Sequence, residues 1–143
     1  MKKAGGMFAI WAALASSAFA DPQEAPSISG VWTGAYTCGQ GVTALRLSIS
    51  APDEGQIAAT FDFGPLEVNV GVPKGLYYME GTFDSKTGHV TLEGVRWILA
   101  PAHYGMVGLD GQLDETGQKI SGSVTRFPNC NGFELERSRA KSG

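Results

Sequence analysis

Hydrophobic and polar residues alternate with a period of two along most of this chain, which is the spacing of a strand with one buried face. The clearest example runs from Ile57 to Phe63, where apolar residues at odd positions alternate with Ala58, Thr60 and Asp62. Beyond residue 29 no stretch keeps a helical period for more than a turn or two. Eight alternating segments cover residues 32–38, 45–49, 57–63, 77–83, 90–99, 107–113, 120–124 and 133–135. The pattern therefore predicts an all-β domain.

Two places depart from simple alternation. In the fifth segment the pattern shifts register at Gly94, and we interpret the shift as a β-bulge after which Val95, Trp97 and Leu99 continue the apolar face. Between residues 63 and 77 a weaker alternation predicts a further, less regular extended segment. Its apolar positions are Leu66, Val68, Val70 and Val72, and its interruptions are Pro65, Gly71 and Pro73.

The connections between the segments are short and polar. Residues 84–88 and 114–117 begin with Asp and end with Gly, as tight hairpin loops do, and residues 52–55 (Pro-Asp-Glu-Gly) have the composition of a turn. Successive hairpins favour a small antiparallel up-and-down barrel of roughly eight strands, because closure leaves no strand edge exposed. A β-sandwich or a half-barrel is the alternative that the pattern leaves open.

The first twenty residues have the composition of a signal peptide. Two lysines precede an apolar run over residues 7–14, and residues 18–20 (Ala-Phe-Ala) fit the small-x-small rule for cleavage after Ala20. The apolar run is too short to span a hydrocarbon layer of ~30 Å. We therefore predict a periplasmic or secreted protein. Its parts are a signal peptide (1–20), a flexible leader (21–29), a single β domain (30–138) and a polar tail (139–143).

The charge of the exported chain restricts its partners. Removal of the signal peptide takes away two of the eleven basic residues and leaves all fourteen acidic ones, a net charge of −5. An acidic domain argues against nucleic acid or an anionic membrane surface as a partner, because both select a basic stripe. The predicted strands are shorter than the ~9–11 residues of an outer-membrane barrel strand and lack aromatic girdles, so we expect no membrane insertion.

Two cysteines, Cys38 and Cys130, stand near opposite ends of the predicted domain. In an oxidising compartment a lone pair this far apart most often forms one disulfide. Closing such a long loop stabilises the fold by roughly 4 to 5 kcal/mol in the chain-entropy model. The rival interpretation is a catalytic thiol, which would need a histidine and a carboxylate arranged around it.

Motifs for catalysis, metal binding and phosphate binding are missing from the sequence. It contains no G-x-S-x-G, no H-E-x-x-H and no phosphate-cradling glycine loop. Neither His89 nor His103 has a metal-type partner at a useful spacing, and the carboxylates at positions 62, 67, 80 and 93 are predicted on outward faces. We therefore predict no catalytic residue, no metal site and no cofactor. A small enzyme with His103 in a pocket is the alternative.

The most distinctive segment runs from Trp97 to Tyr104 (Trp-Ile-Leu-Ala-Pro-Ala-His-Tyr) and joins two predicted strands through a longer loop. Trp97, His103 and Tyr104 are therefore candidate contact residues at a barrel mouth. Trp97 suits the core equally well. Tyr77 and Tyr78 are adjacent, so one of them faces outward if both lie on a strand, and Tyr78 is a further candidate contact.

A resemblance to lipocalin and avidin-like barrels begins at Ser29-Gly30-Val31-Trp32, which is similar to their G-x-W opening. That resemblance implies that Trp32 closes one end of the barrel and that an arginine packs over its ring. Arg46 and Arg96 interrupt otherwise apolar strands, and Arg46 is the expected closing residue. Small secreted inhibitors of bacterial metalloproteases are also similar. They share the barrel type, a comparable S-G-x-W after a short leader and a single disulfide.

A second resemblance extends across the whole domain. An uncharacterised exported domain of Gram-negative bacteria, sometimes found beside caspase-like protease domains, is similar to this chain at several places. They are Trp32-x-Gly34-x-Tyr36-x-Cys38-x-Gln40-Gly41-x-Thr43, Trp97-Ile98, Pro101, Tyr104 to Leu109, and Cys130 with Phe133. The resemblance implies export and paired cysteines, and it implies no activity.

The sequence thus predicts a non-catalytic binding module that recognises a protein partner through its barrel rim, as an inhibitor or an envelope accessory factor. An aromatic-rich interior favours the rim, because eight strands leave room for little more than side chains. If the interior is hollow, the alternative is a lipocalin- or avidin-like carrier of a small apolar ligand.

Overall fold

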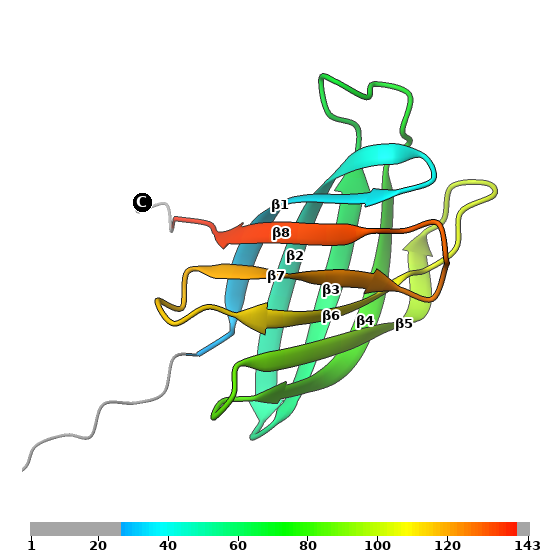
Figure 1. The fold of residues 1–143 in the computed structure, drawn as a ribbon. Helices are drawn as coiled ribbons and strands as arrows, with labels where there is room; N and C mark the ends of the chain where they lie inside the picture. Colours follow the sequence, from blue (N-terminus) through cyan, green and yellow to red (C-terminus); the bar gives the residue numbers. More distant parts are fainter. Residues whose placement is uncertain (1–26, 140–143) are drawn as a thin grey trace, which may run out of the picture.

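Eight antiparallel strands pair in sequence order, and the last strand pairs with the first to close a barrel (Figure 1). The computed structural model describes residues 27–139, so the predicted signal peptide and most of the leader lie outside the described residues. The strands are β1 (Gly30–Cys38), β2 (Gly41–Asp53), β3 (Gln56–Gly64), β4 (Gly75–Asp84), β5 (His89–Leu99), β6 (Gly108–Leu113), β7 (Lys119–Thr125) and β8 (Gly132–Arg137). The predicted up-and-down β-barrel is confirmed.

Alternate residues of the strands point into the barrel and fill it. The odd-numbered residues from Leu45 to Ile49 in β2 and from Ile57 to Phe63 in β3 are buried, as the period-two pattern predicts. Across the centre, the ring of Phe61 stacks on that of Tyr77 with centroids 4.6 Å apart and meets Tyr36 edge-on at 5.1 Å. These side chains occupy the space that a hollow carrier barrel would reserve for a ligand.

One end of the barrel is closed by Trp32 together with the chain that precedes β1. Trp32 is 0% exposed, and its indole Nε1 donates a hydrogen bond to the Ile28 carbonyl oxygen at 3.0 Å. The guanidinium of Arg137 lies over the same ring and donates to the carbonyl oxygens of Ser27 and Ser29 at 2.7 and 2.8 Å. Residues 27–29, the end of the predicted leader, therefore pack against the barrel.

The arginine over Trp32 is Arg137 of β8, so the prediction of Arg46 as the closing residue is wrong. Arg46 is exposed on the outer wall, because the even-numbered residues of β2 point away from the core. Arg96 does lie across an aromatic ring, with its guanidinium carbon 4.6 Å from the ring centroid of Tyr78. The ring of Tyr78 lies on the outer wall of β4, so this contact does not close an end of the barrel.

The predicted bulge in β5 is present. Val95 has no partner on β4, because Gly94 and Arg96 pair with consecutive residues of that strand. The side chain of Val95 is exposed, however, and a second register shift near the end of β5 turns Leu99 outward as well. Of the three apolar residues predicted to continue the core face, only Trp97 packs against the core.

The weaker alternation between β3 and β4 is a loop, so the prediction of a further extended segment is wrong. Leu66 and Asn69 form one isolated β-bridge across it. Val68 and Val70 are 80% and 76% exposed, since no neighbouring strand covers them. The two prolines in residues 65–74 cannot donate to a ladder, which is consistent with a loop.

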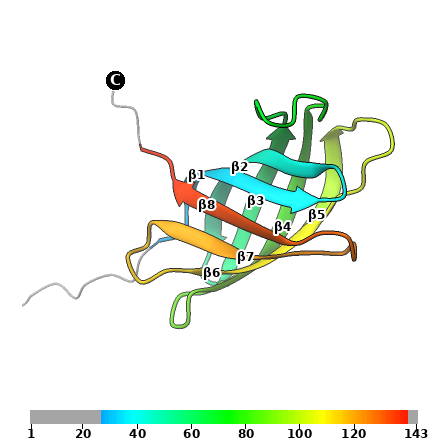
Figure 2. The same cartoon turned by 45° about the horizontal axis from the view of Figure 1, so that its top comes forward.

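The two ends of the barrel differ in their connections (Figures 1 and 2). Short turns at residues 54–55, 85–88 and 114–118 surround the end that Trp32 closes. The opposite end, which we call the loop end, is built from the turn at residues 39–40 and the loops at 65–74, 100–107 and 126–131. The prediction of shorter strands is wrong for β1 to β5, which are 9 to 13 residues long. Within residues 27–139 there is no helix long and apolar enough to cross a membrane.

Candidate functional site

A cleft of about 350 Å³ opens at the loop end, between the turn after β1 and the loops before β6 and β8. We call it the rim cleft. Its lining combines aromatic, amide and sulfur-containing side chains with backbone. The lining residues are Tyr36, Cys38, Gly39, Gln40, His103, Tyr104, Gly105, Val107, Phe127, Asn129 and Cys130. Two of the four predicted contact residues, His103 and Tyr104, therefore meet in one site.

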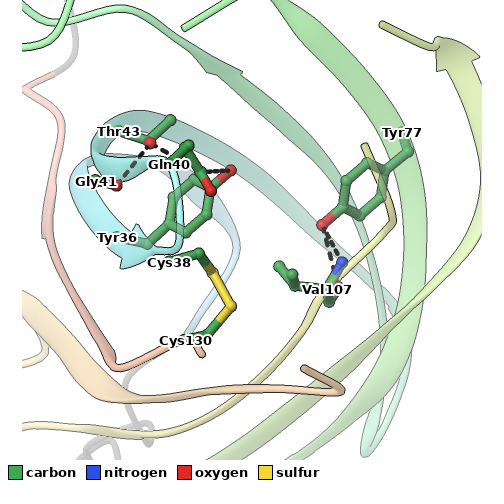
Figure 3. The surroundings of a disulfide bond; sticks show 8 residues. All are labelled: Tyr36, Cys38, Gln40, Gly41, Thr43, Tyr77, Val107 and Cys130. Atoms are coloured by element: carbon green, nitrogen blue, oxygen red, sulfur yellow. Dashed lines mark hydrogen bonds between the residues drawn. A yellow bond between two sulfur atoms is a disulfide. The ribbon is translucent and has the colours of Figure 1, made fainter. Parts of the chain in front are cut away.

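The disulfide between Cys38 and Cys130 forms part of the lining of the rim cleft (Figure 3). Cys38 ends β1 and Cys130 lies two residues before β8, so the bond ties together the two strands whose pairing closes the barrel. The predicted disulfide is confirmed. A disulfide is compatible with an oxidising, extracytoplasmic compartment.

The loop at residues 100–107 is held over the barrel mouth by two aromatic residues of the core. The ring of Tyr104 stacks on that of Phe63 with centroids 5.5 Å apart. Near the other end of the loop, the hydroxyl of Tyr77 donates to the Val107 carbonyl oxygen at 3.1 Å and accepts from the Val107 amide at 2.9 Å. This anchoring places Tyr104 and Val107 on the lining of the rim cleft.

The other two predicted contact residues lie outside the rim cleft. The ring of Trp97 packs 5.0 Å from that of Tyr77 and 6.3 Å from that of Phe63, so Trp97 belongs to the aromatic core behind the cleft. Tyr78 lies on the outer wall beneath Arg96. The structure therefore brings together only the two residues contributed by the loop itself.

Two residues of the loop end have backbone conformations that are uncommon outside glycine. His103 has a φ of 67° and Arg126 a φ of 93°, while the other positive-φ residues in the described part of the chain are glycines. Conformations of this kind collect at functional sites, where the surrounding structure holds them in place. The ring of His103 is exposed and forms no side-chain hydrogen bond within residues 27–139.

A chain of hydrogen bonds runs behind the rim cleft (Figure 3). The hydroxyl of Thr43 donates to the Gly41 carbonyl oxygen at 3.1 Å. The Gln40 amide nitrogen donates to the Thr43 hydroxyl oxygen at 2.9 Å and to the Tyr36 hydroxyl oxygen at 3.3 Å. Asn69 donates to the Gln40 carbonyl oxygen at 2.8 Å and so links this turn to the loop at 65–74. Burial raises the pKa of Tyr36 well above its ordinary range, so its hydroxyl keeps its proton.

Sequence reasoning missed several lining residues, above all Tyr36, Gln40, Phe127 and Asn129. A signal existed for the first two, since both belong to the Tyr36-x-Cys38-x-Gln40 run that carries the second resemblance. Phe127 and Asn129 stand just before Cys130. Their place beside Tyr36 follows only once the disulfide has brought the loop at 126–131 against β1.

The rim cleft offers apolar surface and hydrogen-bonding groups, and no acidic residue lines it. His89, the other histidine, lies on the exposed outer wall with its Nε2 atom 2.8 Å from Asp110 Oδ1, and neither residue lines the cleft. Within the described part of the chain, no group of three His, Cys, Asp or Glu side chains could hold a metal ion.

Comparison with known proteins gives no match to a family model, to a curated protein or to a solved structure. What the rim cleft and the surface around it bind is therefore inferred from their own geometry and chemistry.

Proposed function

We propose that this protein is a non-catalytic recognition module, periplasmic or secreted, that binds a protein partner through the loop end. One observation carries the proposal: five of the six large apolar side chains exposed on residues 27–139 lie at that end. They are Val68, Val70, Ile98, Leu99 and Phe127, and the sixth is Val95 on the same strand as Ile98. A concentration of exposed apolar side chains at one end of a domain favours a protein interface there.

The charges at the two ends favour a particular partner chemistry. The loops at 65–74, 100–107 and 126–131 contain Lys74, Arg126 and His103 against a single acidic residue, Glu67. Around the closed end, the turns at 54–55, 85–88 and 114–118 contain three acidic residues and one lysine, and Arg137 lies over Trp32 there. A chain that is acidic overall thus presents its least acidic surface at the loop end. We therefore propose a partner surface that is apolar at its centre and acidic at its margin.

The other two functions considered for the sequence receive less support. A carrier of a small apolar ligand needs a hollow interior, and Phe61 and Tyr77 stack across the centre of this one. An enzyme built on His103 needs a carboxylate or a nucleophile beside it, and the lining of the rim cleft contributes neither. Recognition by the loop end uses the exposed apolar side chains and the charge of that end. An inhibitor and an envelope accessory factor would both act in this way.

Site-specific crosslinking tests the proposal. A photo-crosslinking amino acid is placed at Val68 or Phe127 of the exported protein in the cells that naturally make it. The matched control places it at Glu54 or Lys86 in the turns of the closed end. We expect one protein adduct from the loop-end positions and none from the closed-end positions.

The partner protein identified in the adduct is then purified without crosslinking. Its binding to the wild-type protein and to the Val68→Ser/Val70→Ser double variant is measured by calorimetry. Removing two exposed apolar contacts is expected to weaken binding by tenfold or more, since truncation of an interface anchor costs more than about 1 kcal/mol. Equal adducts from both ends, or equal affinity of the double variant, would contradict recognition by the loop end.

A further inference from the structure

Two buried tyrosines of the barrel interior, Tyr36 and Tyr77, differ in the hydrogen bonds that their hydroxyl groups form (Figure 3). The hydroxyl of Tyr77 both donates and accepts, and both of its partners are backbone atoms of Val107. The hydroxyl of Tyr36 accepts from Gln40 and donates to no group within residues 27–139. Tyr36 is only 4% exposed and lines the rim cleft, so a group that enters the cleft can supply the missing acceptor.

The hydrogen bonds behind the rim cleft run towards the Gly41 carbonyl at one end and the Tyr36 hydroxyl at the other. A backbone carbonyl can only accept, so the proton of the Thr43 hydroxyl is committed to Gly41. The oxygen of Thr43 accepts from the amide nitrogen of Gln40. The second proton of that nitrogen points to the oxygen of Tyr36. The proton of the Tyr36 hydroxyl is therefore left over.

The unpaired hydroxyl belongs to a cleft that offers both apolar surface and hydrogen-bonding groups. Tyr36 lines the rim cleft, whose apolar surface comes from Tyr104, Phe127, Val107 and the disulfide. No carboxylate lines the cleft, and His103 and Asn129 add groups that can donate. A buried donor without an acceptor destabilises the protein, so such a group calls for a partner.

We propose that the rim cleft binds an apolar group that carries a carboxylate or carbonyl oxygen, and that this oxygen accepts the hydrogen bond of the Tyr36 hydroxyl. The inference deepens the proposed function and rests on it for one source of that oxygen, an apolar residue at the end of the partner's chain. A free small carboxylic acid has the same chemistry. Because the Tyr36 hydroxyl stays protonated at neutral pH, it donates to either.

Titration of the exported protein with small probes, followed by ¹H–¹⁵N NMR, tests the inference. The probes are phenylacetate and 2-phenylethylamine, which share an aromatic ring and differ in whether they bring an acceptor or a cation. We expect phenylacetate to shift the amides of Gln40, Gly105 and Asn129, which line the cleft, and the amine to leave them unchanged. A short peptide that ends in phenylalanine with a free carboxylate distinguishes a chain terminus from a free acid by its affinity relative to phenylacetate, and its amidated form measures the contribution of the carboxylate.

Variants then assign the bond to Tyr36. Tyr36→Phe is expected to weaken phenylacetate binding by at least tenfold, as loss of a hydrogen bond to a charged acceptor does. Tyr78→Phe makes the same chemical change on the outer wall and should bind as wild type does. In the wild-type protein, a nuclear Overhauser contact between the Tyr36 hydroxyl proton and the probe gives the same assignment without a variant.

Three results would overturn the inference: equal binding by Tyr36→Phe, equal shifts from the acid and the amine, or no shift at the cleft with millimolar phenylacetate. None of them would alter crosslinking from Val68, which lies outside the rim cleft. A failure of the cleft is therefore distinguishable from a failure of the loop end as a partner surface.

Discussion

The guanidinium carbon of Arg137 lies 4.4 Å from the ring centroid of Trp32, so a residue of the last strand stacks on a residue of the first. The same guanidinium donates hydrogen bonds to the carbonyl oxygens of Ser27, Ser29 and Gly117. One side chain therefore joins the chain before β1, the turn before β7 and the strand pair that closes the barrel. It fixes the closed end of the barrel, as the disulfide fixes the loop end.

Replacing Arg137 with alanine is expected to destabilise the barrel strongly. A cation–π contact contributes about 0.5–2 kcal/mol, and a hydrogen bond to a charged group about 1.5–3 kcal/mol. Because such terms are not additive, we expect the free energy of unfolding to fall by about 2–4 kcal/mol. Urea unfolding followed by tryptophan fluorescence measures the loss. Arg46→Ala on the outer wall is the matched control and should stay within about 0.5 kcal/mol of wild type. Equal losses would mean that the contacts of Arg137 do not hold the end closed.

Breaking the disulfide should lower stability by a comparable amount. Cys38 and Cys130 have a sequence separation of 92, and a cross-link that closes so long a loop stabilises by roughly 4 to 5 kcal/mol in the chain-entropy model. We expect the urea midpoint of the wild type to fall in reductant to that of Cys38→Ser/Cys130→Ser, which should not respond to reductant. An unchanged wild-type midpoint under conditions where mass spectrometry shows full reduction would refute this expectation.

Close approach of β4 and β5 makes Gly81 sensitive to any side chain. A Cβ atom at this position would collide with the carbonyl oxygen of Thr91, which belongs to the paired strand and cannot move without breaking the ladder. We expect Gly81→Ala to lower the free energy of unfolding by about 2 kcal/mol or more. The control is Gly71→Ala, where nothing lies within 4 Å and φ is not left-handed, so its thermal midpoint should stay near that of wild type. Similar losses of Tm in the two variants would rule out the collision as the cause.

The period-two pattern located all eight strands because each strand buries one face against a filled interior, and a slip by one residue would expose that whole face. The pattern gave wrong predictions where the pairing between strands determines which side chains are buried. Val68 and Val70 alternate like strand residues, but no neighbouring strand covers them. Leu99 follows a second register shift that depends on how β5 meets β4. Alternation reports which side chains can share a face and does not report what covers that face.

The candidate site was predictable only in part, for a related reason. His103 and Tyr104 follow from the length and aromatic content of one loop, which is local information. Tyr36 and Phe127 meet through barrel closure and the disulfide, which connect distant parts of the chain. The error over Arg46 was avoidable, because the alternation of β2 already directs residue 46 outward.

The alkaline limb of the stability curve should report the two buried tyrosines. Burial raises the pKa of Tyr36 and of Tyr77 well above the ordinary value of 10.0. Below pH 10 both tyrosines are protonated in the folded and the unfolded protein, so their contribution to the free energy of unfolding is fully present. Above that pH the tyrosines of the unfolded chain lose their protons, while those of the folded barrel retain them. Stability then falls as pH rises, by about 1.4 kcal/mol per pH unit for each tyrosine. Urea unfolding at increasing alkaline pH should give a shallower slope for Tyr36→Phe and for Tyr77→Phe than for wild type. The lysines titrate alike in all three proteins and cancel in the comparison. If the two variants and the wild type shared one slope, neither tyrosine would be held protonated by the core.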